Sequence, residues 1–195
     1  MKGKVKANTV DRYLRPIREQ IVNLVEERST VLEVGCGNGD LLLKLASKLK
    51  HGVGIDLSRS LIEFAKQRVK SEGHEHLQFI ESNVLEDGLP ADRFDASISS
   101  LLYHVIPQDA AKNILKKQVT ASNTTIICGF SEPKHFKHKL LLWLDQRFNK
   151  HYPHFKHYAK QGYMKGLMKS AGIGKFEEID TFDPVIKIYL LKPED

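Results

Sequence analysis

The sequence VLEVGCGNGD at residues 31–40 decides the fold, because an apolar strand runs directly into a glycine-rich turn and then into an apolar helix. Glycines occupy alternate positions in the turn, where the missing Cβ lets the backbone turn tightly and approach a ligand closely. The stretch therefore predicts a cradle for a nucleotide cofactor. The spacing argues against a dinucleotide, since the third glycine of G-x-G-x-x-G would fall at Asp40, whereas here it comes one residue earlier, at Gly39.

An acidic residue closes the next apolar run at a distance that suits the same cradle. Residues 52–56 read GVGID, and Asp56 lies seventeen residues after Gly39. A carboxylate at the carboxyl end of a strand can accept hydrogen bonds from both hydroxyl groups of a ribose. We expect Asp56 to bind the ribose of an adenosyl group. The alternative is an N-cap, because a helix-start pattern S-x-x-E follows at residues 60–63.

With Glu33 two residues before its first glycine, the turn resembles motif I of the class I S-adenosylmethionine-dependent methyltransferases. The resemblance continues to about Phe130. Residues 77–84, LQFIESNV, resemble the third strand and following turn of that family, where an acidic residue usually binds the adenine amine. Asn83 stands there, either as a neutral acceptor for the amine or as an ordinary turn residue. Residues 93–107, RFDASISSLLYHVIP, resemble the fourth strand and the "FD…LxHV.P" pattern of the small-molecule subgroup.

This resemblance implies an α/β fold, a Rossmann-like doubly wound seven-stranded sheet that is mostly parallel and has an antiparallel C-terminal strand. It implies S-adenosyl-L-methionine as the cofactor and S-adenosyl-L-homocysteine as the product. Open α/β sheets bind ligands beyond the carboxyl ends of their strands, where the matching residues would converge. The residues implied to bind the cofactor are Glu33, Gly35, Cys36, Gly37, Gly39, Asp56, Leu57, Asn83, Val84 and Ser99.

Apolar periodicity independently indicates the same fold class. Apolar residues recur at helical spacing over residues 17–25, 41–49 and 62–69. Strand-like runs lie near residues 30–35, 52–56, 77–81, 94–100 and 124–130, and two more, 176–181 and 185–191, suggest a closing hairpin. Alternation of helices and strands predicts a parallel sheet that is covered on both faces.

Length and composition predict a single domain. The chain has 195 residues, of which 41% are hydrophobic, enough for one well-filled α/β domain. We expect residues 1–195 to form this one methyltransferase domain, with a helical cap at 1–29 and a basic, aromatic helical insertion or lid at 131–175. The two cysteines, Cys36 and Cys128, lie far apart in the sequence, which fits a reducing compartment without a disulfide framework.

No apolar segment of the sequence predicts a transmembrane helix. The basic start at residues 1–6 has no apolar region behind it, and the longest apolar run, residues 140–144, is too short to span a bilayer. We therefore expect a soluble, cytoplasmic protein.

Residues 132–175 concentrate the positive charge of the chain. They hold ten Lys or Arg and two Asp or Glu, a balance of +8, which leaves about −2 for the rest of a chain whose net charge is +6. Five of the nine histidines and seven aromatic residues lie here as well. Such a surface suits an anionic small molecule, a phospholipid headgroup at a membrane, or RNA, although a solvated basic face is the commoner meaning of such a charge run.

The histidines at positions 151, 154 and 157 have the spacing of metal ligands. We expect Pro153 to interrupt any helix that would align their rings, and no cysteine or carboxylate cluster accompanies them. The sequence therefore predicts no metal site.

The expected chemistry is in-line transfer of a methyl group from a sulfonium to a nucleophile. Alignment supplies much of the rate, and a general base adds to it only if the acceptor must lose a proton. His104 is the candidate base, because it follows the fourth strand and an imidazole titrates near neutrality; a packing histidine is the alternative. The expected acceptor-side residues are Tyr13, Tyr103 and Trp143.

These observations predict a methyltransferase that acts on a small-molecule or lipid-like acceptor. Methyltransferases of amino groups in DNA, RNA or glutamine resemble one another in an N/D-P-P-Y/F motif, whereas residues 99–102 here read SSLL. An RNA or protein substrate is the first alternative, with nucleic acid as the partner. A non-catalytic S-adenosylmethionine-binding protein is the second, since residues 121–123 read ASN in place of the usual glycine-rich turn before the fifth strand.

Overall fold

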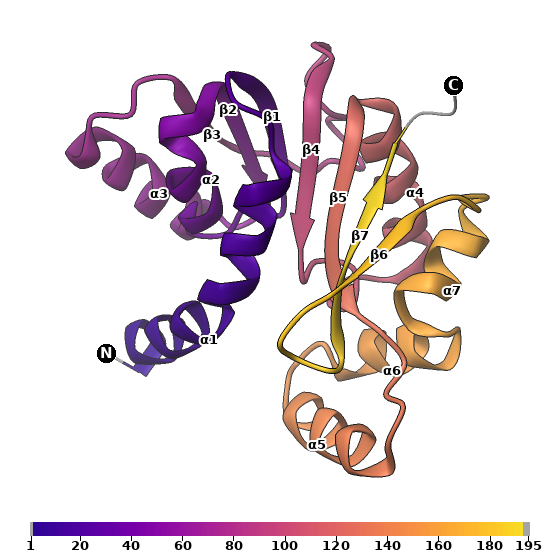
Figure 1. Cartoon of the computed structure of the whole chain (residues 1–195). Helices are drawn as coiled ribbons and strands as arrows, with labels where there is room; N and C mark the ends of the chain where they lie inside the picture. Colours follow the sequence, from indigo (N-terminus) through magenta and orange to yellow (C-terminus); the bar gives the residue numbers. More distant parts are fainter. Residues whose placement is uncertain (1, 193–195) are drawn as a thin grey trace.

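The structure is a computed structural model that describes the backbone of residues 2–192 and the side chains of residues 12–192. Its centre is one sheet of seven strands in the order β3-β2-β1-β4-β5-β7-β6 (Figure 1). The strands are β1 (Ser29–Val34), β2 (Leu49–Asp56), β3 (Leu77–Glu81), β4 (Phe94–Ser100), β5 (Ser122–Phe130), β6 (Glu177–Asp180) and β7 (Ile186–Leu191).

The first five strands pair in parallel, and β7 runs antiparallel to both β5 and β6. This arrangement confirms the predicted fold class and the closing hairpin at the end of the chain. Strand β2 begins at Leu49, earlier than the apolar run that predicted it, because the polar His51 still pairs with Thr30 of β1. Ladder hydrogen bonds extend a strand beyond the part that apolar side chains reveal.

Helices cover the sheet, and the apolar periodicity predicted α1, α2 and α3. The stripe predicted over residues 41–49 extends too far, because α2 ends at Leu45 and Leu49 begins β2. Helix α3 contacts β2 and β3, whereas α4 and α7 contact β5 and each other. The helices are α1 (Lys2–Leu24), α2 (Asp40–Leu45), α3 (Arg59–Glu72), α4 (Gln108–Thr120), α5 (Phe136–Arg147), α6 (Tyr152–Lys160) and α7 (Tyr163–Ser170), with a short 3₁₀ helix η1 (Ala46–Lys48). The central strands β1, β4 and β5 are buried along most of their length, as a sheet covered on both faces requires.

Helix α1 places its apolar stripe against the core. Ile17, Ile21 and Val25 are buried, which confirms the helical spacing seen in the sequence. The helix contains Pro16, and Figure 1 shows that its N-terminal part bends away from the part that packs beside α2. Proline removes a helical hydrogen bond and commonly produces such a bend.

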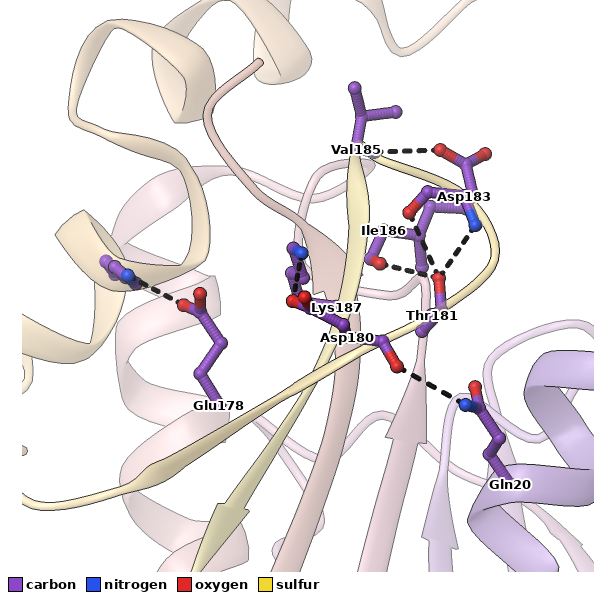
Figure 2. A network of polar contacts seen from close by, with 9 residues as sticks. Gln20, Glu178, Asp180, Thr181, Asp183, Val185, Ile186 and Lys187 are labelled. Carbon is purple, nitrogen blue, oxygen red and sulfur yellow. Dashed lines mark hydrogen bonds and ion pairs between the residues drawn. The ribbon is translucent and has the colours of Figure 1, made fainter. Parts of the chain in front are cut away.

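The loop between β6 and β7 is held by a small polar network (Figure 2). The Thr181 hydroxyl donates to the Ile186 carbonyl at 2.7 Å, and the Val185 N–H donates to Oδ1 of Asp183 at 2.8 Å. Lys187 of β7 is buried and forms an ion pair with Asp180 of β6, which lowers the pKa of that carboxyl. These bonds determine the path of the loop.

Side-chain contacts join the same loop to α1. We call this set of contacts the α1–hairpin clasp, and it consists of Tyr13, Gln20, Asp180, Phe182 and Asp183. The Tyr13 hydroxyl donates to Oδ2 of Asp183 at 2.5 Å, and the Tyr13 ring meets Phe182 edge-on at 5.1 Å. The Gln20 amide donates to the Asp180 carbonyl at 3.3 Å (Figure 2). Helix α1 and the C-terminal hairpin are thereby connected.

In the part of the chain that the structure describes, no helix has both the length and the apolar character needed to cross a bilayer.

We predict that Tyr13→Phe lowers the free energy of unfolding by about 1.5–3 kcal/mol, the usual range for a hydrogen bond to a charged group. The substitution removes the bond to Asp183 and retains the ring packing on Phe182. Urea unfolding monitored by circular dichroism measures the change. An unchanged free energy of unfolding would show that the clasp does not contribute to stability.

Candidate cofactor site

The candidate site lies at the carboxyl ends of β1, β2 and β4. Strand β1 has β2 on one side and β4 on the other, so the order of the strands reverses between β1 and β4. Open α/β sheets bind ligands outside the strand ends at such a switch point. Figure 1 shows these ends at the bottom of the view, on the same side as α5 and the N-terminal part of α1.

The glycine turn at the end of β1 combines tight packing with one open position. The N–H groups of Gly35 and Cys36 both donate to the Ile55 carbonyl of β2, at 2.8 and 3.0 Å. Gly39 has a φ of +75°, and a Cβ there would lie 2.6 Å from Cζ of Phe79. Gly37 has a φ of +54°, and a Cβ there would meet nothing within 4 Å. Gly39 is therefore required for packing, whereas Gly37 presents bare backbone to open space.

Asp56 ends β2 beside this open position. Its Oδ2 accepts the Gly37 N–H at 2.9 Å, and its Oδ1 accepts the Ser58 N–H at 2.8 Å. A carboxylate offers about four lone-pair sites, so these two bonds leave capacity for two further donors. The side chain thus holds the turn and the residue that precedes α3, while it can still accept from the two hydroxyls of a ribose. The N-cap alternative is wrong, because the N-cap of α3 is Ser58, and Asp56 accepts the N–H of Ser58 rather than one in the first turn of the helix.

Glu33 is buried in β1, two residues before Gly35. Among the described residues, its Oε2 has no hydrogen-bond partner. Burial raises the pKa of the carboxyl to about 8, although the positive charge of Arg18 acts in the opposite direction. The carboxyl accepts a backbone hydrogen bond from Leu42, but a buried acidic group with one oxygen left unpartnered is costly for a fold and points to a role beyond packing.

Cys36 fills the turn as a small buried residue. Its Sγ lies close to Gly54, where an added Cβ would come within 2.9 Å of the sulfur. Burial raises the pKa of the thiol far above its ordinary value, so the thiolate that reacts is not populated near neutral pH. Both Cys36 and Cys128 are free and buried.

Three further residues predicted to bind the cofactor, Leu57, Asn83 and Val84, differ in their exposure and in how many of their polar groups are already bonded. Leu57 follows Asp56 and is exposed, whereas Val84 is buried. Oδ1 of Asn83 accepts the Leu85 N–H at 3.1 Å, and the Asn83 N–H donates to Asp87 at 2.8 Å. Asn83 therefore makes the turn after β3, and its side-chain oxygen retains one lone pair for a ligand.

Ser99 and Tyr103 lie in the interior rather than at the mouth of the site. Ser99 of β4 is fully buried, and its side chain lies beside the Tyr103 hydroxyl. That hydroxyl donates to the side chain of Gln118 in α4. Burial also raises the pKa of Tyr103 strongly. Tyr103 therefore joins the loop after β4 to α4, whereas Ser99 remains inside β4.

His104 sits in a cluster of aromatic rings beneath α6. Its ring meets Phe130 edge-on at 4.8 Å, and Phe155 and Tyr158 lie 6.3 and 6.4 Å away. Desolvation, and to a lesser extent His151, lower the pKa of His104 to about 4. The imidazole is therefore neutral at physiological pH, and this environment is that of the packing histidine that the sequence left as an alternative.

Tyr13 and Trp143, the other two predicted acceptor-side residues, lie on elements that border the site. Tyr13 is half exposed and belongs to the α1–hairpin clasp, where burial and Asp183 raise its pKa to about 12. Trp143 of α5 donates from its indole nitrogen to the Tyr152 hydroxyl at 2.9 Å. No contact between Tyr13 and Trp143 is evident among the described residues, but Asp145 of α5 is close enough to influence Tyr13 electrostatically.

Sequence reasoning missed two features beside the glycine turn. Leu101 has a φ of +53°, a strained value for a branched residue, and the next residue, Leu102, packs where a Cβ on Gly35 would lie. The "LxHV.P" pattern marked this loop without indicating its conformation. A cavity of about 410 Å³ also opens on the outer side of the turn, with the lining residues Arg12, Arg15, Asn38, Asp40, Lys44, Phe64 and Arg68. These residues are scattered in the sequence, and no motif connects them.

The structure corrects the prediction that Pro153 interrupts a helix among the three histidines with metal-ligand spacing. Pro153 does not interrupt a helix, because it lies in the first turn of α6, where its missing N–H has no helical acceptor. His151 precedes that helix, and His154 and His157 lie within it. Over the described residues, no three His, Cys, Asp or Glu side chains gather as a metal-binding group.

Comparison with known proteins finds a family match for part of the chain. Residues 31–122 match the family model of a methyltransferase domain. This segment contains the glycine turn, Asp56, Asn83 and Ser99, so the recognised motifs and the matched region coincide.

The curated relatives carry different names. One match is the mitochondrial ribosomal RNA small subunit methyltransferase of Arabidopsis thaliana, 28% identical over 118 residues, which cover 60% of this chain and 29% of the relative. Another is the 2-phytyl-1,4-naphtoquinone methyltransferase of Trichormus variabilis, 38% identical over 72 residues, which cover 35% of this chain and 31% of the relative. The matches thus span about a third of these relatives.

Solved structures share the fold over most of the chain. The N-methyltransferase NodS from Bradyrhizobium japonicum aligns with a TM-score of 0.67 and 18% identity, covering 94% of this chain and 98% of that one. NodS has also been solved in complex with S-adenosyl-L-homocysteine. The likeness at this identity concerns the fold.

Two glycine substitutions that both place a Cβ at positive φ should affect different properties, protein stability at Gly39 and ligand affinity at Gly37. Gly39→Ala adds overpacking against Phe79, so its free energy of unfolding should fall by about 1–3 kcal/mol more than that of Gly37→Ala. Gly37→Ala should instead lower the affinity for S-adenosyl-L-homocysteine, because the methyl group enters the open space. Urea unfolding and calorimetric titration separate the two. Equal losses of stability would contradict the assignment.

We also predict a pH dependence caused by Glu33. Because the folded-state pKa of about 8 lies above the usual value of 4.5, this group destabilises the folded state progressively as pH rises from 4.5 to 8. Glu33→Gln removes that dependence, so the variant should gain stability relative to the wild type over this range and match it below the range. Unfolding midpoints in urea, measured from acid to alkaline pH, test this. Parallel curves for both proteins would show that Glu33 titrates normally.

Proposed function

We propose that this chain, which carries a class I methyltransferase domain, transfers a methyl group from S-adenosyl-L-methionine to a small-molecule or lipid-like acceptor. The observation that carries the proposal is the open backbone at Gly37 next to the Asp56 carboxylate, at the switch point of the sheet. The family match over residues 31–122 includes both residues.

The residues at this point fit the cofactor by their chemistry. When bound, S-adenosyl-L-methionine supplies a sulfonium-activated methyl group. Asp56 has two free lone pairs for the ribose hydroxyls, exposed Leu57 offers an apolar surface to one face of the adenine, and Asn83 offers one lone pair to its amine. The backbone at Gly37 lets the ligand approach closely.

The protein would contribute alignment rather than strong acid–base catalysis. Alignment alone supplies roughly 7 to 11 kcal/mol in well-oriented reactions. His104, with a pKa of about 4, is a weak base at neutral pH, because an effective base has a pKa near the working pH. We therefore assign His104 to the wall of the acceptor side, and we infer an acceptor atom that does not have to lose a proton before it attacks the methyl group.

The acceptor side is proposed to lie under α5 and α6, within the basic segment 131–175, with α1 as the cap on the opposite border. One relative is named as a 2-phytyl-1,4-naphtoquinone methyltransferase, which favours an apolar or lipid-like acceptor. RNA is the second candidate, since the segment carries +8 and another relative is named for ribosomal RNA. The two buried free cysteines are compatible with the proposed cytoplasmic setting.

We predict that S-adenosyl-L-homocysteine raises the melting temperature and that NAD does not, because the turn lacks the dinucleotide spacing. Asp56→Ala should weaken S-adenosyl-L-homocysteine binding by about 1.5–3 kcal/mol, roughly tenfold or more. Asp92→Ala, in the exposed loop before β4, is the matched control and should bind like the wild type. Calorimetry measures both.

Turnover distinguishes an enzyme from a protein that only binds the cofactor. The protein is incubated with isotopically labelled methyl donor and, separately, with a lipid extract and with total RNA, and labelled products are detected by mass spectrometry. We expect label in the lipid or small-molecule fraction. Tight S-adenosyl-L-homocysteine binding without any labelled product would leave the non-catalytic binding protein, and stabilisation by NAD alone would refute the proposal.

A further inference from the structure

The outer face of α5 carries a continuous apolar ridge. Phe136, Leu140, Leu144 and Phe148 follow one another at intervals of four residues, the spacing that aligns side chains along one side of a helix. Their exposed fractions are 79%, 43%, 42% and 81%, and neighbouring Leu141 is 54% exposed. We call these five side chains the α5 ridge. Large apolar side chains gathered in this way on a surface mark an interaction site.

The opposite side of α5 explains why the ridge faces outward. Leu142 and Gln146 are buried against the rest of the protein, and Trp143 is tied to Tyr152 of α6. On a helical wheel Leu142 and Gln146 lie across from the ridge, whereas Trp143 lies at its edge, beside Phe136. The helix is therefore fixed by one side, and the side that would be polar on an ordinary surface helix is apolar instead.

Positive charges flank the ridge. Over residues 134–150 there are five exposed Lys or Arg and one acidic residue, Asp145: the five are Lys134, Lys137, Lys139, Arg147 and Lys150. The Arg147 guanidinium lies over the Trp143 ring, 4.7 Å from its centroid, and 5.7 Å from that of Phe148. Apolar anchors and cations thus share one surface.

The position of α5 makes this surface available. Figure 1 shows α5 at the bottom of the view, beyond the carboxyl ends of the parallel strands, with no other element on its outer side. At about 1.5 Å per residue the helix is roughly 18 Å long, well short of a bilayer core of about 30 Å. It can lie in a membrane surface but cannot cross the membrane.

We propose that the α5 ridge docks the protein on the surface of an anionic phospholipid membrane. The leucines and phenylalanines enter the boundary between headgroups and acyl chains, and the surrounding lysines and arginine bind the anionic headgroups. A second copy of the chain would bring the same cations against this face, which opposes self-association. RNA would engage the cations and leave the leucines without a role. This inference is independent of the proposed methyl transfer.

Vesicle sedimentation tests the apolar part. Wild-type protein is mixed with phosphatidylcholine vesicles and with vesicles of phosphatidylcholine and phosphatidylglycerol in equal amounts. We expect binding to the anionic vesicles, and Leu140→Ser/Leu144→Ser should lower the partition coefficient by about tenfold or more. The matched control, Leu61→Ser/Leu85→Ser, removes two leucines that are each 40% exposed elsewhere and should bind like the wild type. Equal binding by both double variants would overturn the proposal.

The charged part is tested in the same way. Lys137→Gln/Lys139→Gln should lower binding to anionic vesicles by about tenfold or more, since each surface-proximal cation contributes about 1 kcal/mol. Lys66→Gln/Lys70→Gln in α3 is the matched control and should have little effect. Binding that depends on the lysines alone, and that poly(U) reproduces and competes for, would instead indicate a surface for any polyanion and would refute a membrane-docking ridge.

The single tryptophan gives a direct readout of which surface docks. Trp143 lies on α5, so its emission should shift to shorter wavelength on anionic vesicles and be quenched by brominated acyl chains. Sedimentation without quenching would show that another surface binds. Light scattering without lipid completes the test: a dimer that Leu140→Ser/Leu144→Ser dissociates would assign the ridge to self-association and overturn the proposal.

Discussion

The hydrogen bond from the Gly37 N–H to the Asp56 carboxylate is the contact on which the candidate site depends. Together with the bonds from Gly35 and Cys36 to the Ile55 carbonyl, it joins the end of β1 to the end of β2 and keeps the turn open. The cost of this arrangement is a backbone at positive φ, which glycine tolerates. Because Asp56 also accepts from Ser58, one carboxylate positions the turn, the start of α3 and the acceptors left for a ligand.

Local patterns predicted most of the fold and the positions of the glycine turn and Asp56 at the ends of neighbouring strands. The glycine turn, Asp56 and the strand runs depend on neighbours in the sequence, and the structure has them where the spacing places them. The contacts that sequence could not reveal are non-local. Tyr13 meets Asp183 across 170 positions, and no periodicity or motif connects them. The low pKa of His104 likewise depends on rings from β5 and α6, so the residue type alone suggested a base where the environment favours a neutral side chain.

In the basic, aromatic segment 131–175, the local sequence pattern does not determine which side chains are buried and which are exposed. The longest apolar run of the sequence, residues 140–144, lies in α5, where Leu140, Leu141 and Leu144 are exposed while Leu142 is buried. Composition identified a basic, aromatic segment, but the face that each side chain occupies was set by the packing of α5 on α6. Pro153 shows the same limit, because its effect depends on whether it lies inside a helix or in the first turn of one.

The α1–hairpin clasp also affects the order in which parts of the chain can fold during synthesis. Tyr13 lies in the first element of the chain, and Asp183 lies between the last two strands. During synthesis the ribosome releases α1 long before the β6–β7 loop exists, so α1 can pack beside α2 early, whereas the Tyr13 hydroxyl has no Asp183 to bind until the last strands emerge. Contacts between such distant residues also slow folding, because a large loop must close before they stabilise anything. The clasp is therefore completed late, after both strands of the C-terminal hairpin have been synthesised.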